Sequence, residues 1–233
     1  MDTFLRGFAE AITLITGLDR NLVEIVALSL WVSGIALAIS VLMGLPLGMW
    51  LGLKRFRGRR LLVALIYTGM GLPPVVVGLS VYLFLSRQGP LGGLGWLFTP
   101  KAMIVAQVIL ALPLVAGFTM ISVAAVPPEL ALQVRALGAN TWQVPLTMLY
   151  EARNGVLAAI VAGFGAAISE VGSVMMVGGN IEHKTRVLTT AIVLETSKGD
   201  FALAIALGII LITFAFSANW VLLHLQGRLE PRP

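Results

Sequence analysis

Glu170 is the residue of this sequence whose position most needs a chemical explanation. It lies in AAISEVGSVMMVGG, near the middle of an apolar run from residue 154 to 179. A charge at the centre of a bilayer costs about 2.5–3.5 kcal/mol or more, so such a carboxylate faces protein or a water-filled path. Two roles of Glu170 remain open. One is gating or helix packing, with Ser169 or a second subunit as its partner. The other is direct contact with a ligand.

Other residues of the same run suit a polar path through a membrane. Gly172, Ser173 and Asn180 offer backbone N–H groups, a hydroxyl and little bulk. Met176, next to Met175, suits an adaptable constriction, although methionines that pack or face lipid are the commoner case. With Glu170, these residues are the predicted pore or gate.

The sequence does not support a catalytic or metal-binding site. The segment GGNIEHKT (178–185) has His183 where a phosphate loop requires its second glycine, and it follows an apolar run rather than a strand. The two histidines, His183 and His224, are far apart, and the chain has no cysteine, which excludes disulfides and Cys-ligated metals. We therefore expect no enzymatic activity, no metal and no cofactor in this chain.

The composition predicts a membrane protein with a single membrane domain. Of the 233 residues, 58% are hydrophobic and 12% are charged, about half the charged fraction of a soluble domain. No polar stretch is long enough for a separate soluble domain. The net charge of +5 does not require a nucleic-acid partner, because five of the sixteen basic residues lie in one loop, KRFRGRR (54–60).

Five apolar runs are long enough to cross about 30 Å of hydrocarbon as helices. The first is about ten residues longer than necessary, and Pro46 would kink it. The predicted fold is therefore an all-α polytopic membrane protein with about five transmembrane helices. Residues 1–20, with an apolar stretch at 4–16, suit a helix lying on the membrane, 21–226 form the membrane domain, and 227–233 form a tail. The runs are 22–53, 61–86, 102–126, 154–179 and 201–225.

Loop charges predict the orientation. The basic loop 54–60 assigns the first connection to the cytoplasm, because Lys and Arg accumulate on that side. The loops 87–100 and 180–200 then lie outside, and residues 127–152 lie inside. The N-terminus is predicted outside and the C-terminus inside. Within 180–200, the stretch TTAIVLETS is apolar enough to re-enter the membrane as a gate.

Two patterns concern helix packing. Gly44, Gly48 and Gly52 recur at intervals of four, which permits close approach of a second helix, although glycine is frequent in membrane helices generally. The segment MGLPPVVVGL (70–79) places two prolines inside the second run. A break there frees carbonyl groups that only protein or a watery cavity can accommodate, so this segment is either a pore wall or a plain kink.

The polar segment PPELALQVRALGANTWQVPLTMLYEA (127–152) predicts two short helices joined by a glycine turn. Pro128 and Glu129 suit a first helical turn, and Ala131, Val134 and Leu137 form an apolar stripe at helical spacing. Gly138 permits a left-handed turn. Asn140 and Gln143 then form a capping box for the second helix. A rigid protrusion of this kind on the cytoplasmic face suits a soluble partner that pushes on it.

The sequence resembles a known family at these residues. The pattern R-A-L-G-A-x-x-W, followed by E-A-R-x-G-x-L-A, resembles the coupling loop of ABC importer permeases, with Leu132-Gln133-Val134 in place of that family's Glu-Ala-Ala triplet. The molybdate/tungstate group is similar over most of the chain, with the tungstate-specific permeases closest. The strings that carry this likeness are GLPPVVVGL (71–79), GPLG (89–92), FTPKAMIVAQ (98–107), GFGAAISEVGSVMMVGGNI (163–181) and TRVLTTAIVLETSKGDF (185–201).

The resemblance implies a permease subunit in the cytoplasmic membrane that imports tungstate or a related oxyanion by alternating access. It implies a homodimer in membrane lipid, two ATP-binding subunits that hydrolyse Mg-ATP, and an extracytoplasmic solute-binding protein. A carboxylate would repel an oxyanion, which favours the gating or packing role of Glu170. The alternatives are an ion-driven secondary carrier, a membrane scaffold, or an importer of the same class for molybdate or sulfate. The residues expected to contact the ATP-binding subunit are Val134, Arg135, Ala136, Leu137, Gly138, Ala139 and Trp142.

Overall fold

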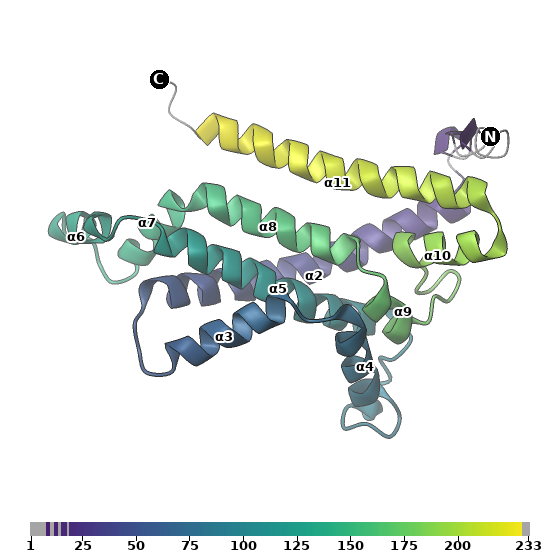
Figure 1. Cartoon of the computed structure of the whole chain (residues 1–233), viewed down its shortest axis with the longest axis horizontal. Helices are drawn as coiled ribbons and strands as arrows, with labels where there is room; N and C mark the ends of the chain where they lie inside the picture. Colours follow the sequence, from purple (N-terminus) through teal and green to yellow (C-terminus); the bar gives the residue numbers. More distant parts are fainter. Residues whose placement is uncertain (1–7, 10–11, 14, 18, 230–233) are drawn as a thin grey trace. The chain divides into compact units, whose positions relative to one another are not determined.

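The computed structural model of the protein describes residues 8–9, 12–13, 15–17 and 19–229. The regular elements of this part of the chain are all helical (Figure 1). The predicted interfacial segment 1–20 and the tail 227–233 lie largely outside the described residues. The elements are α2 (Arg20–Leu53), α3 (Arg59–Met70), α4 (Pro74–Leu85), the 3-10 turn η1 (Gly92–Leu94), α5 (Pro100–Ala124), α6 (Pro128–Ala136), α7 (Gln143–Glu151), α8 (Arg153–Ile168), α9 (Gly172–Gly178), α10 (Leu188–Lys198) and α11 (Phe201–Leu229).

Within the described residues, three helices are by themselves long and apolar enough to cross a membrane: α2, α5 and α11. Two bent pairs, α3 with α4 and α7 with α8, raise the number to five if each pair is one span. The second predicted run is thus two helices rather than one. The fourth is also interrupted, because α8 ends at Ile168 and α9 begins at Gly172. The helix α2 continues through Pro46.

The break between α3 and α4 follows from its sequence. Gly71 caps the end of α3, and its N–H donates to the carbonyl of Thr68 at 3.1 Å. Pro73 is extended, with φ −63° and ψ 122°, and Pro74 occupies the first turn of α4. A proline suits this position because it has no N–H group to leave unpaired. The double proline is therefore a helix end followed by a helix start.

The chain divides into two compact units. Unit 1 comprises Met1–Ala36, Pro73–Gln107 and Gly165–Ala218, and unit 2 comprises Leu37–Leu72, Val108–Phe164 and Asn219–Pro233. In unit 1, α4 packs beside α9 (Figure 1). The start of α2 packs against α10 and the start of α11 through Leu22, Ile25, Leu188, Ala191, Ala206 and Leu207.

Unit 2 contains the close helix contact that the glycine ladder predicts. A Cβ atom on Gly44 would lie 3.0 Å from Cγ1 of Val115, and one on Gly52 would lie 3.0 Å from the Met120 carbonyl oxygen. A Cβ on Gly48 would collide with the carbonyl oxygen of Ala116. The three glycines thus let the second half of α2 lie directly on the backbone of α5, and the packing interpretation is confirmed.

We predict that Gly48→Ala lowers the thermal midpoint of unfolding in detergent. The added methyl group meets backbone rather than a flexible side chain, and overpacking of this kind costs about 1–3 kcal/mol. Gly34→Ala is the matched control, because it lies in the same helix with no atom within 4 Å of the new Cβ. Helix propensity alone would favour alanine at both positions. Equal midpoints for the two variants would contradict close packing at Gly48.

Candidate functional site

The helices α6 and α7 in unit 2 are joined by a turn centred on Gly138. Pro128 occupies the first turn of α6 with Glu129 beside it, and Arg135 lies in the last turn. The carboxylate is therefore near the positive end of the helix dipole and the guanidinium near the negative end, and both placements are stabilising. Gly138 has φ +88°, and its N–H donates to the carbonyl of Arg135 at 2.9 Å. Because L-residues with a side chain rarely adopt this φ, the turn depends on glycine.

The predicted hydrogen bonds between Asn140 and Gln143 form in the turn that leads into α7, whose N-cap residue is Trp142. The side-chain oxygen of Asn140 accepts from the N–H of Gln143 at 2.9 Å and from that of Trp142 at 3.0 Å. In return, the N–H of Asn140 donates to Oε1 of Gln143 at 2.8 Å. These bonds satisfy donors that a helix start leaves unpaired, so α7 begins at a defined residue. The turn is consequently rigid at both of its ends.

One side of the helix pair is packed and the other is exposed. Leu130, Ala131 and Leu149 pack against a buried cluster of Val123, Met148, Ala152 and Val156, which α5, α7 and α8 contribute. Of the predicted apolar stripe, Ala131 and Val134 are half-buried and Leu137 is exposed. Leu137 caps the C-terminus of α6 and turns outward, with 88% of its surface exposed.

The exposed side of this helix pair is unusually apolar. Trp142 is 79% exposed, and Leu132, Leu146 and Tyr150 are also exposed. Exposed apolar side chains of this size suit a protein interface. Of the residues expected to contact a partner, Val134 and Ala139 are half-buried, and the exposed ones are Arg135, Ala136, Leu137, Gly138 and Trp142.

The second candidate site is the break between α8 and α9 in unit 1. The carbonyl of Ala167, near the end of α8, accepts from Nε2 of Gln107 on α5 at 2.9 Å. The carbonyl of Glu170 accepts from the hydroxyl of Thr189 on α10 at 2.7 Å. Two helices that are distant in sequence thus supply the donors that a continuous helix would have supplied. Sequence reasoning missed both donors, because neither lies in a recognisable motif.

Glu170 itself organises the start of α9. Its Oε1 accepts from the backbone N–H of Ser173 at 2.8 Å and from the Ser173 hydroxyl at 3.1 Å. The expected partner, Ser169, instead donates to the carbonyl of Gly165 at 2.6 Å. Glu170 is buried and Ser173 has no exposed surface. The contacts therefore support helix packing as the role of this carboxyl group.

The other predicted pore residues lie mainly against protein. A Cβ on Gly78 of α4 would meet Ser173 at its Cα and Met176 at its Sδ, and Gly172 lies against Val75 of α4. Asn180 has φ +50° and donates through its Nδ2 to the carbonyl of Thr190 at 3.3 Å. Their role in a pore or gate stays a prediction, and the contacts assign them a packing role within unit 1.

The segment 178–185 forms a loop after α9 rather than a phosphate loop after a strand. The hydroxyl of Thr185 donates to the carbonyl of Gly178 at 2.6 Å and accepts from the N–H of Ile181 at 2.9 Å. His183 has φ +58°, and its Nδ1 lies 2.7 Å from Oε2 of Glu24. Two side chains distant in sequence thus hold this loop to the start of α2.

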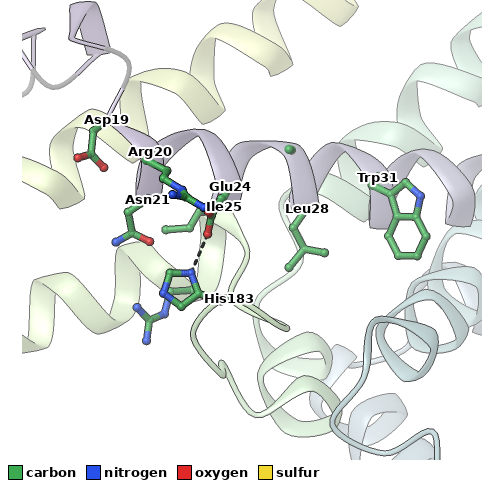
Figure 2. A pocket seen from close by; sticks show the side chains of 10 residues that line it. Asp19, Arg20, Asn21, Glu24, Ile25, Leu28, Trp31 and His183 are labelled. Carbon is green, nitrogen blue, oxygen red and sulfur yellow. Dashed lines mark hydrogen bonds and ion pairs between the residues drawn. The ribbon is translucent and has the colours of Figure 1, made fainter.

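A cavity of about 1150 Å³ lies beside this contact (Figure 2). Figure 2 shows His183 pointing toward Glu24, which also pairs with Arg20 at 3.1 Å. Positively and negatively charged side chains line the cavity, because Asp19 and Arg186 belong to its polar wall. Trp31 lies on its apolar wall. No group of three potential metal ligands occurs in the described part of the chain.

The family match and the similar relatives agree with one another. A family model described as binding-protein-dependent transport system inner membrane component matches residues 44–231. A probable anion ABC transporter permease protein of Haloferax volcanii is 46% identical over 203 residues, 85% of this chain and 88% of that one. The tungstate uptake system permease protein of Peptoclostridium acidaminophilum is 41% identical over 97% of this chain and 99% of its own.

The fold also matches solved structures. An inward-facing structure of the MetNI methionine ABC transporter is similar with a TM-score of 0.75 and 18% identity, over 90% of this chain and 96% of that chain. At this identity the likeness concerns the fold alone.

We predict that the acceptor oxygen of Glu170, rather than its charge, stabilises unit 1. Glu170→Gln keeps an oxygen at Oε1 and should unfold within a few degrees of the wild type. Glu170→Ala leaves the Ser173 N–H buried without a partner, which costs about 1–3 kcal/mol. Ser173→Ala removes only the hydroxyl and should fall between the two. Thermal unfolding in detergent measures all three, and a Gln variant as unstable as the Ala variant would show that the charge is required.

Proposed function

The chain belongs to the family of binding-protein-dependent transport system inner membrane components, and on this premise we propose that it imports tungstate or a related tetrahedral oxyanion. It is a multi-pass inner-membrane permease subunit of an ABC importer, and not an enzyme in its own right. The observation that carries the proposed substrate is the likeness to a tungstate uptake permease over nearly the whole of both chains. The family match favours this reading over an ion-driven carrier.

Family membership also implies the partners, an ATPase and a binding protein. In the proposed assembly, two copies of this chain form a homodimer with a path between them. Two ATP-binding subunits hold and hydrolyse Mg-ATP, so that this chain needs no cofactor of its own. A solute-binding protein delivers the anion from outside. Because that protein selects the anion first, molybdate and sulfate remain alternative substrates for the same architecture.

The proposed orientation places the α6–α7 pair on the ATP side. The basic loop 54–60 assigns the connection between α2 and α3 to the cytoplasm. The N-terminus is then outside, the C-terminus inside, and the exposed Leu137 and Trp142 meet the ATP-binding subunit. Burial of these two side chains would remove the most exposed apolar surface of α6 and α7 from water.

Force is proposed to pass through the Gly138 turn. The hydrogen bonds between Asn140 and Gln143 hold the turn that leads into α7, and α7 is followed after Ala152 by α8 at a bend of 74°. Movement of α6 and α7 by the ATP-binding subunit therefore reaches α8 directly through the chain. The helices then reorient to open the path alternately to each side, with the break at Glu170 as the proposed gate region.

The function is tested in the complex reconstituted in proteoliposomes with its ATP-binding subunit and binding protein. We expect the tungstate-loaded binding protein to stimulate ATPase activity several-fold. Gly138→Val should abolish most of this stimulation, because a β-branched residue resists φ +88°. Gly138→Asn is the matched control and should retain more, since asparagine tolerates positive φ.

The possible outcomes test the proposed substrate and the proposed mechanism separately. Stimulation by molybdate or sulfate but not by tungstate would replace the proposed anion and leave the permease function intact. No stimulation by any loaded binding protein would overturn the importer proposal. Equal stimulation in the Val variant would show that the turn does not transmit force.

A further inference from the structure

The loop between α2 and α3 encloses a cationic pocket in unit 2. The pocket has a volume of about 580 Å³ and its charged lining consists of Arg55, Arg57, Arg59 and Arg60. Its remaining wall comes from Phe56, from the end of α2 and from Ala124 of α5. No carboxylate lines it, and none of the ion pairs between described residues includes these arginines. Such a concentration of positive charge favours an anionic ligand.

Local contacts hold the pocket in shape. Nε of Arg59 donates to the carbonyl of Leu51 at 2.8 Å, which ties the start of α3 to the end of α2. The ring of Phe56 stacks on Trp50 with centroids 4.3 Å apart and planes 29° apart. Gly58 precedes α3 with φ +91°, a conformation that a glycine adopts without strain. The loop is therefore a built turn rather than a flexible run of charges.

The start of α3 adds to the positive potential. This helix has 12 residues, with no acidic residue in its first turn and no side-chain cap. The N–H of Arg59 donates to the carbonyl of Phe56 at 3.3 Å and that of Leu61 to the carbonyl of Gly58 at 3.0 Å, so the contribution of the helix start is its dipole. The pocket thus combines guanidinium groups with a helix start, and both attract a phosphate group.

Apolar surface adjoins the pocket. On α3, Leu61 is 65% exposed and Leu65 is 58% exposed, one turn apart. Trp50, at the end of α2, is also exposed, and aromatic rings of this kind are enriched at membrane interfaces. A free anion would gain nothing from these side chains, whereas a phospholipid would bury acyl chain against them.

We propose that this pocket binds the phosphate of an anionic phospholipid from the cytoplasmic leaflet, with its acyl chains along Leu61 and Leu65 of α3. Basic residues next to the cytoplasmic end of a membrane helix are suited to anionic headgroups. Arg55, Arg57 and Arg60 contact the headgroup, and Arg59 positions the loop through Leu51. The lipid neutralises arginines that would otherwise repel one another.

The test uses the complex with its ATP-binding subunit in nanodiscs of phosphatidylcholine, with or without phosphatidylglycerol. Native mass spectrometry counts the phosphatidylglycerol retained after release from the nanodisc. Arg57→Gln/Arg60→Gln should weaken retention about 30-fold, about fivefold for each arginine. The control, Arg87→Gln/Lys101→Gln, removes the same charge from unit 1 and should retain lipid as the wild type does.

Two further arms separate the possible ligands. Leu61→Ser/Leu65→Ser should weaken lipid retention while leaving the arginines in place, which tests the acyl-chain contact independently. Inorganic phosphate added to phosphatidylcholine nanodiscs should not raise the thermal midpoint of unfolding. A rise with phosphate equal to that with phosphatidylglycerol would overturn the lipid assignment, as would equal lipid retention by the Gln variant and its control.

Discussion

A backbone polar group in a bilayer must find its hydrogen-bond partner within the protein, and most of this structure depends on that constraint. The long helices α2, α5 and α11 satisfy it along their own length. Between α8 and α9 the helix is interrupted, and side chains complete the pairing: Gln107 and Thr189 donate to freed carbonyls, while Glu170 accepts from the N–H of Ser173. Between α3 and α4 the constraint is eased differently, because Pro73 and Pro74 have no N–H to leave unpaired. The carboxyl group of Glu170 is thus explained by backbone geometry before any role in transport is considered.

The features that could be predicted from the sequence are those encoded by neighbouring residues. The hydrogen bonds between Asn140 and Gln143 join residues only three positions apart, and the turn at Gly138 depends on the φ of that one residue. The ladder of Gly44, Gly48 and Gly52 has a fixed spacing that permits close approach of a second helix, and the structure shows that approach. Leu137 lies at the end of α6, in the turn that the sequence predicts around Gly138. The donors Gln107 and Thr189, and the pairing of His183 with Glu24, join residues far apart in sequence, so no local pattern could indicate them.

The same reasoning separates rigid from adaptable parts of the permease. Close backbone contact between α2 and α5 in unit 2 resists relative movement, because a Cβ at Gly48 would collide with α5 and one at Gly44 or Gly52 would be tightly packed. The break at α8–α9 in unit 1 is held by single hydrogen bonds, each of which contributes only about 0.5–1.5 kcal/mol net. A transporter that reorients around a path needs both: a packed frame that transmits movement, and a segment whose alternative pairings differ little in free energy. In the proposed mechanism, that movement enters the chain at the Gly138 turn.

The α6–α7 pair is proposed to lie on the ATP side and to contact the ATP-binding subunit. The chain contains no cysteine, so single-cysteine labelling with a membrane-impermeant maleimide is free of background. Thr141→Cys reports on the turn, and Leu91→Cys reports on the loop after α4; both native residues are exposed. We expect Leu91→Cys to be labelled in intact cells, whereas Thr141→Cys is labelled only after permeabilisation and less strongly when the ATP-binding subunit is present. Labelling of Thr141→Cys in intact cells would place the turn on the outside and overturn this arrangement.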